Sequence, residues 1–220
     1  MAAIDSDDYH DYFIKNGRLI GAFEEMYQKF PDPWSCVANA GSIDNVLFLA
    51  LVRHVRDGVK HALDVGCGRG ALTLQIKEIL EPTVMFQACD VSATVIAGGR
   101  QLDSAIDWFV ADLRDPKALT HRAGSLDLIA MSQLAWCVLP TLEPMLRHFH
   151  ELLRPGGHLF VQQSFLDRKT QEYGIGVLET TTDFKRMIEA AGFQIKADVQ
   201  LDPREEPNRP ENWIALMERP

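Results

Sequence analysis

Strand-like and helical runs alternate along most of this chain, and the alternation limits its fold more than any other feature. Seven apolar runs rich in β-branched or aromatic residues predict strands, at residues 61–65, 83–89, 106–111, 126–131, 158–164, 193–201 and 213–218. Amphipathic runs predict helices, at residues 71–80, 93–102, 141–153 and 184–191, with a short helix near Lys117. Strands that alternate with helices are typical of βαβ units and a mainly parallel sheet.

The strands also predict how the sheet is arranged. Their nearly continuous apolar character is typical of a sheet that has helices on both faces. The last two strands follow each other without a helix, so we expect them to pair antiparallel at one edge. The sequence therefore predicts an α/β, doubly wound, Rossmann-like sheet of seven strands. We expect this domain to occupy residues 59–220 as one compact unit, after a helical lid segment over residues 1–58.

The part of the chain before the first strand has a different character. A helical spacing of aromatic and apolar side chains runs from Tyr9 through Ile20 to Phe30. A further helix is predicted from about Ile43 to Arg56, with Ser42 as its N-cap. These helices precede the sheet and are expected to lie outside it.

Composition and charge narrow the classes of partner. The chain has 220 residues, 46% of them hydrophobic, which suits one domain with a sizeable core. Its net charge of −9 is opposite to the basic surface that nucleic-acid binding needs. No apolar run approaches the roughly 20 residues of a membrane span, and the N-terminus differs from a signal peptide. We therefore expect a cytoplasmic protein that binds neither nucleic acid nor a membrane.

The cysteines do not form a metal-binding pattern. Cys36, Cys67, Cys89 and Cys137 are widely separated, without a Cys-x-x-Cys pair or a histidine at zinc-ligand spacing. We expect free thiols and no metal site.

The most informative segment is a glycine-rich loop within ALDVGCGRGALT, Ala62 to Thr73. A strand ends at Val65, glycines follow at once, and a helix begins near Ala71. Glycines at this point let the chain turn sharply and let a ligand approach bare backbone. On its own the loop also fits the G-x-G-x-x-G/A fingerprint of dinucleotide-binding proteins, so it leaves two classes of cofactor open.

Three aspartates at the ends of consecutive strands favour one of these classes. Asp64 directly precedes the glycines, where its charge would repel a pyrophosphate and attract a ligand with an ammonium and a sulfonium group. Asp90 closes the second strand, where a carboxylate can accept both ribose hydroxyls, and Val91 suits a face of adenine. Asp112 closes the third strand, within reach of the adenine amino group. Together they predict a crevice for a nucleoside that carries positive charge.

Five segments resemble the motifs of class I S-adenosylmethionine-dependent methyltransferases. They are LDVGCGRG (63–70), ACDVS (88–92), VADLRD (110–115), LDLIAMSQ (126–133) and LLRPGGHLFV (152–161). The resemblance covers roughly residues 60–218. It implies a seven-stranded sheet with the last strand antiparallel, S-adenosyl-L-methionine as the cofactor and S-adenosyl-L-homocysteine as the product.

The resemblance also implies roles for individual residues. The cofactor-binding residues would be Asp64, Gly66, Cys67, Gly68, Asp90, Val91, Asp112, Leu113 and Ser132. The first four would hold the methionine end and Asp90 the ribose. Val91 would pack on adenine, while Asp112 and the Leu113 backbone would recognise its edge. Ser132 would begin the loop that faces the methyl group.

Other side chains near this crevice could bind the methyl acceptor. The candidates come from the lid and from the loops after the fourth and fifth strands: Tyr12, Tyr27, Trp34, Gln133, Trp136, Gln163 and Tyr173. Aromatic residues at helical spacing are more often core than ligand contacts, which leaves a structural role open for Tyr12 and Tyr27. Trp34 lies in the segment FPDPW (30–34), where no helical period requires it. This segment also resembles a bacterial subgroup that acts on small molecules and includes nodulation N-methyltransferases.

The predicted function is transfer of a methyl group from S-adenosylmethionine to a nitrogen or oxygen atom of a small molecule. No His–Asp pair stands out as a general base, and no catalytic residue is assigned. An amine or an activated hydroxyl needs alignment with the methyl group rather than a strong base. Two alternatives stay open: a nicotinamide-dependent oxidoreductase, which rests on the glycine loop alone, and a non-catalytic cofactor-binding protein of the same fold.

Overall fold

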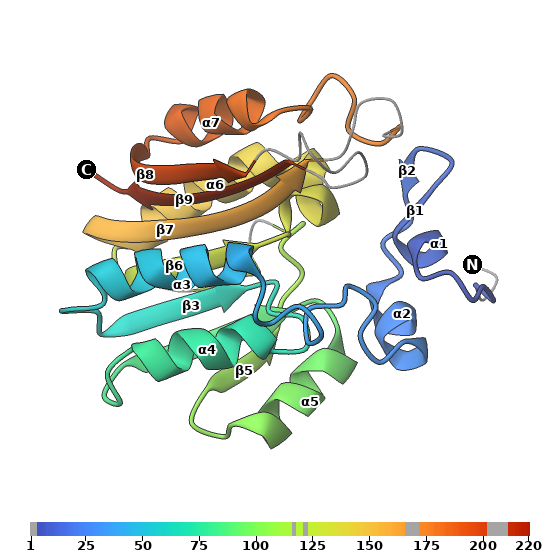
Figure 1. Ribbon diagram of the computed structural model, residues 1–220, viewed down its shortest axis with the longest axis horizontal. Helices are drawn as coiled ribbons and strands as arrows, with labels where there is room; N and C mark the ends of the chain where they lie inside the picture. The colour runs from blue at the N-terminus through green and yellow to red at the C-terminus, as the bar shows by residue number, and fades with distance from the viewer. Residues whose placement is uncertain (1–3, 116–117, 121–122, 166–171, 202–210) are drawn as a thin grey trace.

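Seven strands form one sheet between two layers of helices (Figure 1). The computed structural model describes residues 4–115, 118–120, 123–165, 172–201 and 211–220 of the chain. The strands are β3 (His61–Val65), β4 (Met85–Asp90), β5 (Asp107–Val110), β6 (Leu126–Ser132), β7 (Leu153–Phe165), β8 (Gln194–Leu201) and β9 (Glu211–Glu218). Their order across the sheet is β5-β4-β3-β6-β7-β9-β8.

The directions of the strands confirm the predicted sheet. From β5 to β7, every neighbouring pair is parallel. β9 pairs antiparallel with both β7 and β8, so among the described strands of this sheet it alone runs against the others. The edge ribbon of the last two strands is therefore present, and the fold is the predicted doubly wound α/β arrangement.

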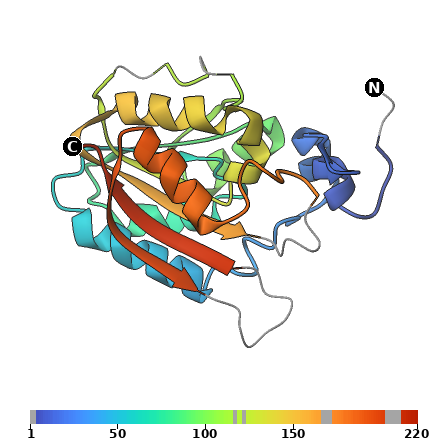
Figure 2. The same cartoon turned by 90° about the horizontal axis from the view of Figure 1, so that it is seen from above.

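Helices cover both faces of the sheet (Figures 1 and 2). One face carries α3 (Ile43–Val55), α4 (Ala71–Ile79) and α5 (Ala93–Leu102), and the other carries α6 (Leu142–Leu152) and α7 (Thr181–Ala190). A 3-10 helix, η1 (Ala135–Thr141), leads into α6. Apolar side chains of both layers fill the space against the strands. Phe48 of α3, for example, is fully buried with its ring centroid 5.9 Å from that of Phe160.

Side-chain caps fix several helix ends. The Ser42 hydroxyl accepts a hydrogen bond from the Asn45 amide at 3.4 Å, so the predicted N-cap of α3 is confirmed. Ser92 caps α5 in the same way, and Thr180 and Asp183 form a reciprocal capping box at α7. β3 and α5 have the predicted limits. The predicted short helix near Lys117 lies outside the described residues, and of the stretch 202–211, for which the sequence predicts a surface loop, only Glu211 is described, as the first residue of β9.

The N-terminal part contains less helix than its spacing predicts. Its elements are α1 (His10–Phe13), β1 (Ile14–Lys15), β2 (Arg18–Leu19) and α2 (Phe23–Lys29). β1 and β2 form a hairpin whose turn residues, Asn16 and Gly17, have φ of 50° and 67°. Positive φ at both positions is what a tight Asn-Gly hairpin turn requires. The helical interpretation is therefore wrong at Ile20, which follows β2 and is 39% exposed.

This N-terminal part lies beyond the carboxyl ends of the strands, on the right in Figures 1 and 2. α3 instead packs on a face of the sheet. The division of the chain at residue 58 into a lid and a domain stays a prediction.

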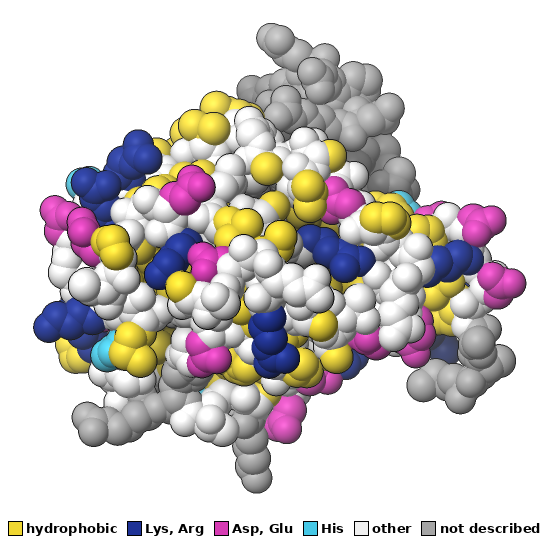
Figure 3. Space-filling view, turned by 90° about the horizontal axis from the view of Figure 1, so that it is seen from below, with side chains coloured by type: hydrophobic (Ala, Val, Ile, Leu, Met, Phe, Trp, Pro, Cys, Tyr) yellow, Lys and Arg dark blue, Asp and Glu magenta, His cyan; other side chains and the backbone are white. Residues whose placement is uncertain are grey.

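The surface shows mixed charge. On the face drawn in Figure 3, Lys and Arg side chains are interspersed with Asp and Glu, so this face does not have a continuous basic surface. Of the helices in the described part of the chain, none has both the length and the apolar character needed to cross a membrane.

Candidate active site

The glycine-rich loop folds back onto the end of β4. The amides of Gly66 and Cys67 both donate to the carbonyl of Cys89, at 2.8 and 3.0 Å. Gly66 and Gly68 have φ of 70° and 51°, a left-handed conformation that residues with a side chain rarely adopt. The loop thereby brings bare backbone at Gly68 against Asp90.

Asp64 lies in β3 just before this loop and is only 3% exposed. The hydroxyl of Thr73, on α4, donates to its Oδ2 at 2.6 Å. Burial raises the pKa of the Asp64 carboxyl to about 6; the Thr73 hydrogen bond opposes this effect and the nearby Asp90 carboxylate adds to it. A cation beside Asp64 would therefore favour its ionised form.

Asp90, at the end of β4, connects the glycine loop to the start of α5. Its Oδ2 accepts from the Gly68 amide at 3.1 Å, and its Oδ1 accepts from the Ser92 amide at 3.0 Å. Burial raises the pKa of the Asp90 carboxyl, although these hydrogen bonds lower it. Within the described residues, neither Lys nor Arg pairs with Asp64 or Asp90. The two aspartates form a buried acidic pair that fits a cationic ligand and would repel a pyrophosphate.

Asp112, which follows β5, is already engaged by an arginine. Nε and Nη2 of Arg114 donate to its two carboxylate oxygens at 2.8 and 2.7 Å, and this bidentate contact lowers the pKa of Asp112. The same guanidinium lies against the N-terminal part, because a Cβ added at Gly21 would be 2.7 Å from its Nη1. A hydrogen bond from adenine to Asp112 would share the carboxylate with Arg114, a partner that the sequence analysis did not single out.

The other predicted cofactor residues lie at or just beyond the carboxyl ends of the neighbouring strands. Val91 directly follows β4 and is half-buried, Leu113 is buried, and Ser132 ends β6 half-buried. Leu113 also lines a cavity of about 60 Å³ together with Met145 and Phe149. This volume is far below the roughly 300–1,000 Å³ of typical ligand pockets, so the cavity is a packing gap beside the crevice.

Glu24, which the sequence analysis missed, connects the start of α2 to the start of α5. Its carboxylate accepts hydrogen bonds from the Ser92 hydroxyl at 2.6 Å and from the hydroxyl and amide of Thr94 at 2.6 and 3.2 Å. Although partial burial acts in the opposite direction, these hydrogen bonds lower the pKa of Glu24 to about 2. A negative charge at the N-terminus of α5 is also favoured by the helix dipole.

Arg69 fastens the other end of α2 from within the glycine loop. It donates to the carbonyls of Tyr27 and Phe30 at 2.5 and 3.0 Å, and its guanidinium lies 5.2 Å from the centre of the Tyr27 ring. A Cβ added at Gly68 would be 3.3 Å from the Tyr27 hydroxyl. Burial raises the pKa of Tyr27, and the Asp90 carboxylate adds to the increase. The structure therefore places Tyr27 against the glycine loop and near Asp90.

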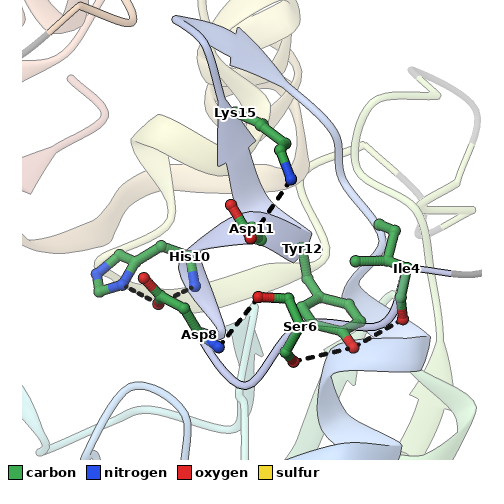
Figure 4. Close-up of polar contacts among 7 residues, drawn as sticks. All are labelled: Ile4, Ser6, Asp8, His10, Asp11, Tyr12 and Lys15. Atoms are coloured by element: carbon green, nitrogen blue, oxygen red, sulfur yellow. Dashed lines mark hydrogen bonds and ion pairs between the residues drawn. The ribbon is translucent and has the colours of Figure 1, made fainter.

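Tyr12 and Trp34 lie within an aromatic cluster of the N-terminal part. Tyr12 is 1% exposed, and its hydroxyl points to backbone, donating to the carbonyl of Ile4 at 2.9 Å (Figure 4). Trp34 packs edge-on against Tyr9 and Phe13, with ring centroids 5.3 and 5.2 Å apart. Both side chains are thus engaged in packing in this structure.

The predicted acceptor residues after β6, Gln133 and Trp136, both hydrogen-bond to β7. Gln133 Oε1 accepts from Gln163 Nε2 at 3.3 Å, and the Ala135 amide donates to Gln163 Oε1 at 3.0 Å. The indole nitrogen of Trp136 donates to the carbonyl of Ser164 at 2.9 Å. The polar groups of these three candidates are therefore directed at the protein itself.

Tyr173 lies near Cys137, a residue that the sequence analysis did not place in the site. Burial raises the pKa of Tyr173, and the Cys137 thiol adds to the increase. Burial also raises the pKa of Cys137 to about 12, with a further increase from Asp90 and a decrease from Arg114. Cys137 is therefore within electrostatic reach of Asp90, Arg114 and Tyr173.

Comparisons with known sequences agree with this geometry. The methyltransferase domain family matches residues 62–157. A carboxy-S-adenosyl-L-methionine synthase from Chromohalobacter salexigens is 26% identical over 181 residues, which are 79% of this chain and 63% of that protein. A highly reducing polyketide synthase from Purpureocillium lilacinum is 30% identical over 126 residues, 53% of this chain and 5% of the synthase. The chain thus spans less than two thirds of the length of each of these relatives.

Solved structures share the fold. The N-methyltransferase NodS from Bradyrhizobium japonicum, in complex with S-adenosyl-L-homocysteine, is similar with a TM-score of 0.65 and 20% identity, covering 87% of this chain and 93% of NodS. An S-adenosylmethionine-dependent methyltransferase from Mesorhizobium loti is similar with a TM-score of 0.64 and 19% identity, covering 82% of this chain and 100% of that one.

The glycine loop and the buried acidic pair, at the carboxyl ends of neighbouring parallel strands, together suit a ligand that carries positive charge. Residues 62–157 match a methyltransferase domain, and the chain shares the fold of solved S-adenosylmethionine-dependent methyltransferases, in agreement with the resemblance seen in the sequence.

Proposed function

We propose that this protein transfers the methyl group of S-adenosylmethionine to a nitrogen or oxygen atom of a small-molecule acceptor in the cytoplasm. The observation that carries the proposal is the buried acidic pair Asp64 and Asp90, at the ends of neighbouring parallel strands and within the matched methyltransferase domain. S-adenosylmethionine carries an ammonium and a sulfonium group, and both suit this pair. The similarity to an N-methyltransferase supports nitrogen as one of the two acceptor atoms.

The residues of the crevice then have separate tasks. Asp64 would hold the ammonium end beside the bare backbone of Gly66, Cys67 and Gly68. The Asp90 oxygens each accept one backbone amide in this structure, and each has a second lone pair with which to accept a ribose hydroxyl.

Adenine would lie against the next two strand ends. Val91 would pack on its face, and Asp112 and the Leu113 backbone would recognise its edge. Because the Arg114 guanidinium holds the Asp112 carboxylate in one orientation, this edge would be preorganised.

The bound cofactor supplies an activated methyl group, so the chain has to align the acceptor and exclude water. Ser132 begins the loop that would border the methyl group, and Tyr27, Trp136 and Tyr173 would surround the acceptor. A neutral amine would react from such a position without a strong base.

We further propose that the N-terminal part is a lid. Tyr27 lies on Gly68, and Leu134 lies on Gly66, where an added Cβ would be 2.8 Å from the Leu134 side chain. The cofactor would reach Gly68 only after α2 moves. Such closure over a ligand is a common gating device in enzymes.

Two measurements test the proposal. Calorimetry should show S-adenosylhomocysteine binding at about −7 to −9 kcal/mol, in the micromolar range. Methyl-labelled cofactor, incubated with a metabolite extract, should then transfer label to a product identified by mass. Failure of both the cofactor and its demethylated product to bind at high protein concentration would contradict the proposal, and binding without transfer would leave the non-catalytic alternative.

A second use of the same cofactor is favoured by one observation, the 26% identity to a carboxy-S-adenosylmethionine synthase. In that case the labelled cofactor itself would gain a carboxyl group from a compound in the extract, and it would keep its labelled carbon. A nicotinamide-dependent oxidoreductase is disfavoured, because the buried Asp64 would repel a pyrophosphate at the glycine loop.

A further inference from the structure

Two glutamine side chains connect the end of β6 to β7. β6 pairs with β7 as far as Ser132 and Gln162, and β7 then continues to Phe165. Beyond that point the Gln133 side chain takes the place of a strand, because its Oε1 accepts from the Ser164 amide at 2.9 Å. The backbone amide of Gln133 donates to the backbone carbonyl of Gln162 at 2.7 Å.

Gln163 completes the connection from β7. Its side chain is fully buried; its Oε1 accepts from the Ala135 amide at 3.0 Å, and its Nε2 donates to Gln133 Oε1 at 3.3 Å. The backbone amides of Ser164 and Ala135 can only donate, so an oxygen of each glutamine must face them. The orientation of both side-chain amides follows from this. We call the pair Gln133 and Gln163 the glutamine brace.

The glutamine brace holds a strained turn. Gln133 has φ of 55°, a left-handed conformation that a residue other than glycine adopts only where its surroundings fix it. The turn directs Leu134 onto Gly66, 2.8 Å from the position of an added Cβ, and it lets the Trp136 indole donate to Ser164. A change in the turn would therefore change the gap between Leu134 and the glycine loop.

We propose that the glutamine brace is a positioning device that sets the space for the methyl group of the cofactor, by fixing Leu134 over the glycine loop. The inference rests on the proposed function, in which the loop after Ser132 borders the methyl group. Gln133 and Gln163 are then positioning residues and do not contact the acceptor.

The test uses the full chain and compares S-adenosylmethionine with S-adenosylhomocysteine, which differ by the methyl group. Gln133→Asn keeps a residue that tolerates positive φ but is too short to reach Ser164. Gln163→Leu removes the hydrogen bonds of the Gln163 side chain to Ala135, Gln133 and Ser164, and Gln163→Glu keeps an acceptor for Ala135 while losing the donor to Gln133 and Ser164. Gln87→Asn is the matched control, since Gln87 lies on β4 and donates to Asp107 at 2.8 Å on the exposed surface.

We expect each brace variant to change the ratio of the two dissociation constants by about threefold or more and to speed hydrogen exchange at residues 134–137. The control should change neither. A ratio within about twofold of wild type, or an equal loss of affinity for both ligands, would overturn the inference. A wild-type protein that binds neither ligand would instead overturn the proposed function. Thermal unfolding shows whether each variant is folded. If Gln163→Leu does not fold, the results for Gln133→Asn and Gln163→Glu test the inference.

Discussion

Replacement of Glu24 by glutamine tests whether charge holds α2 over the crevice. Hydrogen bonds from Ser92 and Thr94 lower the pKa of Glu24 from 4.5 to about 2, against the effect of its partial burial. At about 1.4 kcal/mol per pKa unit this corresponds to about 3 kcal/mol, which solvent screening reduces to about 1–2 kcal/mol. A carboxyl group whose pKa is lowered by folding stabilises the folded state at every pH above its ordinary pKa. The contribution is therefore complete above pH 4.5 and is lost as pH falls through about 2.

Hydrogen exchange within α2 measures this contribution, because α2 can open without unfolding of the sheet. We expect Glu24→Gln to speed exchange of these amides by about 5- to 30-fold at neutral pH. The difference from wild type should narrow as pH falls from 4.5 towards 2. Glu25→Gln, at the next and exposed position of the same helix, is the matched control. If α2 of Glu24→Gln exchanges at the wild-type rate, the charge of Glu24 does not hold α2 and the reasoning is refuted.

Three further predictions concern the crevice and its cover. The affinity of wild-type protein for S-adenosylhomocysteine should fall as pH falls through about 6, because protonated Asp64 cannot pair with the ammonium group; calorimetry should show no such step in Asp64→Asn. Asp90→Ala should weaken the same binding by about 2–4 kcal/mol, whereas a change under about twofold would leave Asp90 a purely structural link between the loop and α5. Trp34→Ala removes edge-on contacts with Tyr9 and Phe13, worth about 1–2 kcal/mol together. It should speed exchange across residues 9–30 and reduce turnover more than cofactor affinity, and normal exchange with normal turnover would argue against a lid.

The sequence predicts the sheet well because local pattern and tertiary burial agree there. β3 and α5 have the predicted limits, since β3 is a short apolar run and a serine caps α5. The β1–β2 hairpin was missed although Asn16 and Gly17 are a recognised turn signal. The aromatic residues on both sides of it happen to follow a helical spacing, which concealed the turn.

The site is less predictable because its polar contacts join distant parts of the chain. Glu24 lies 70 residues from Thr94, and Gln133 lies 30 residues from Gln163. Spacing along the sequence indicated that both glutamines belong near the crevice. It could not indicate that they hydrogen-bond to each other, because that depends on where β6 stops and β7 continues.

The place of β9 between β7 and β8 has a consequence for biosynthesis. β7 and β8 are both made before β9, and neither pairs with the other in the finished sheet. While the chain is being translated, the edge of β7 is therefore open, and β8 has no neighbour until β9 has left the ribosome. An uncovered strand edge can pair with another chain, so the nascent protein is exposed to aggregation until β9 is in place. During this interval a molecular chaperone would protect the chain by covering the open edge of β7 and the unpaired β8.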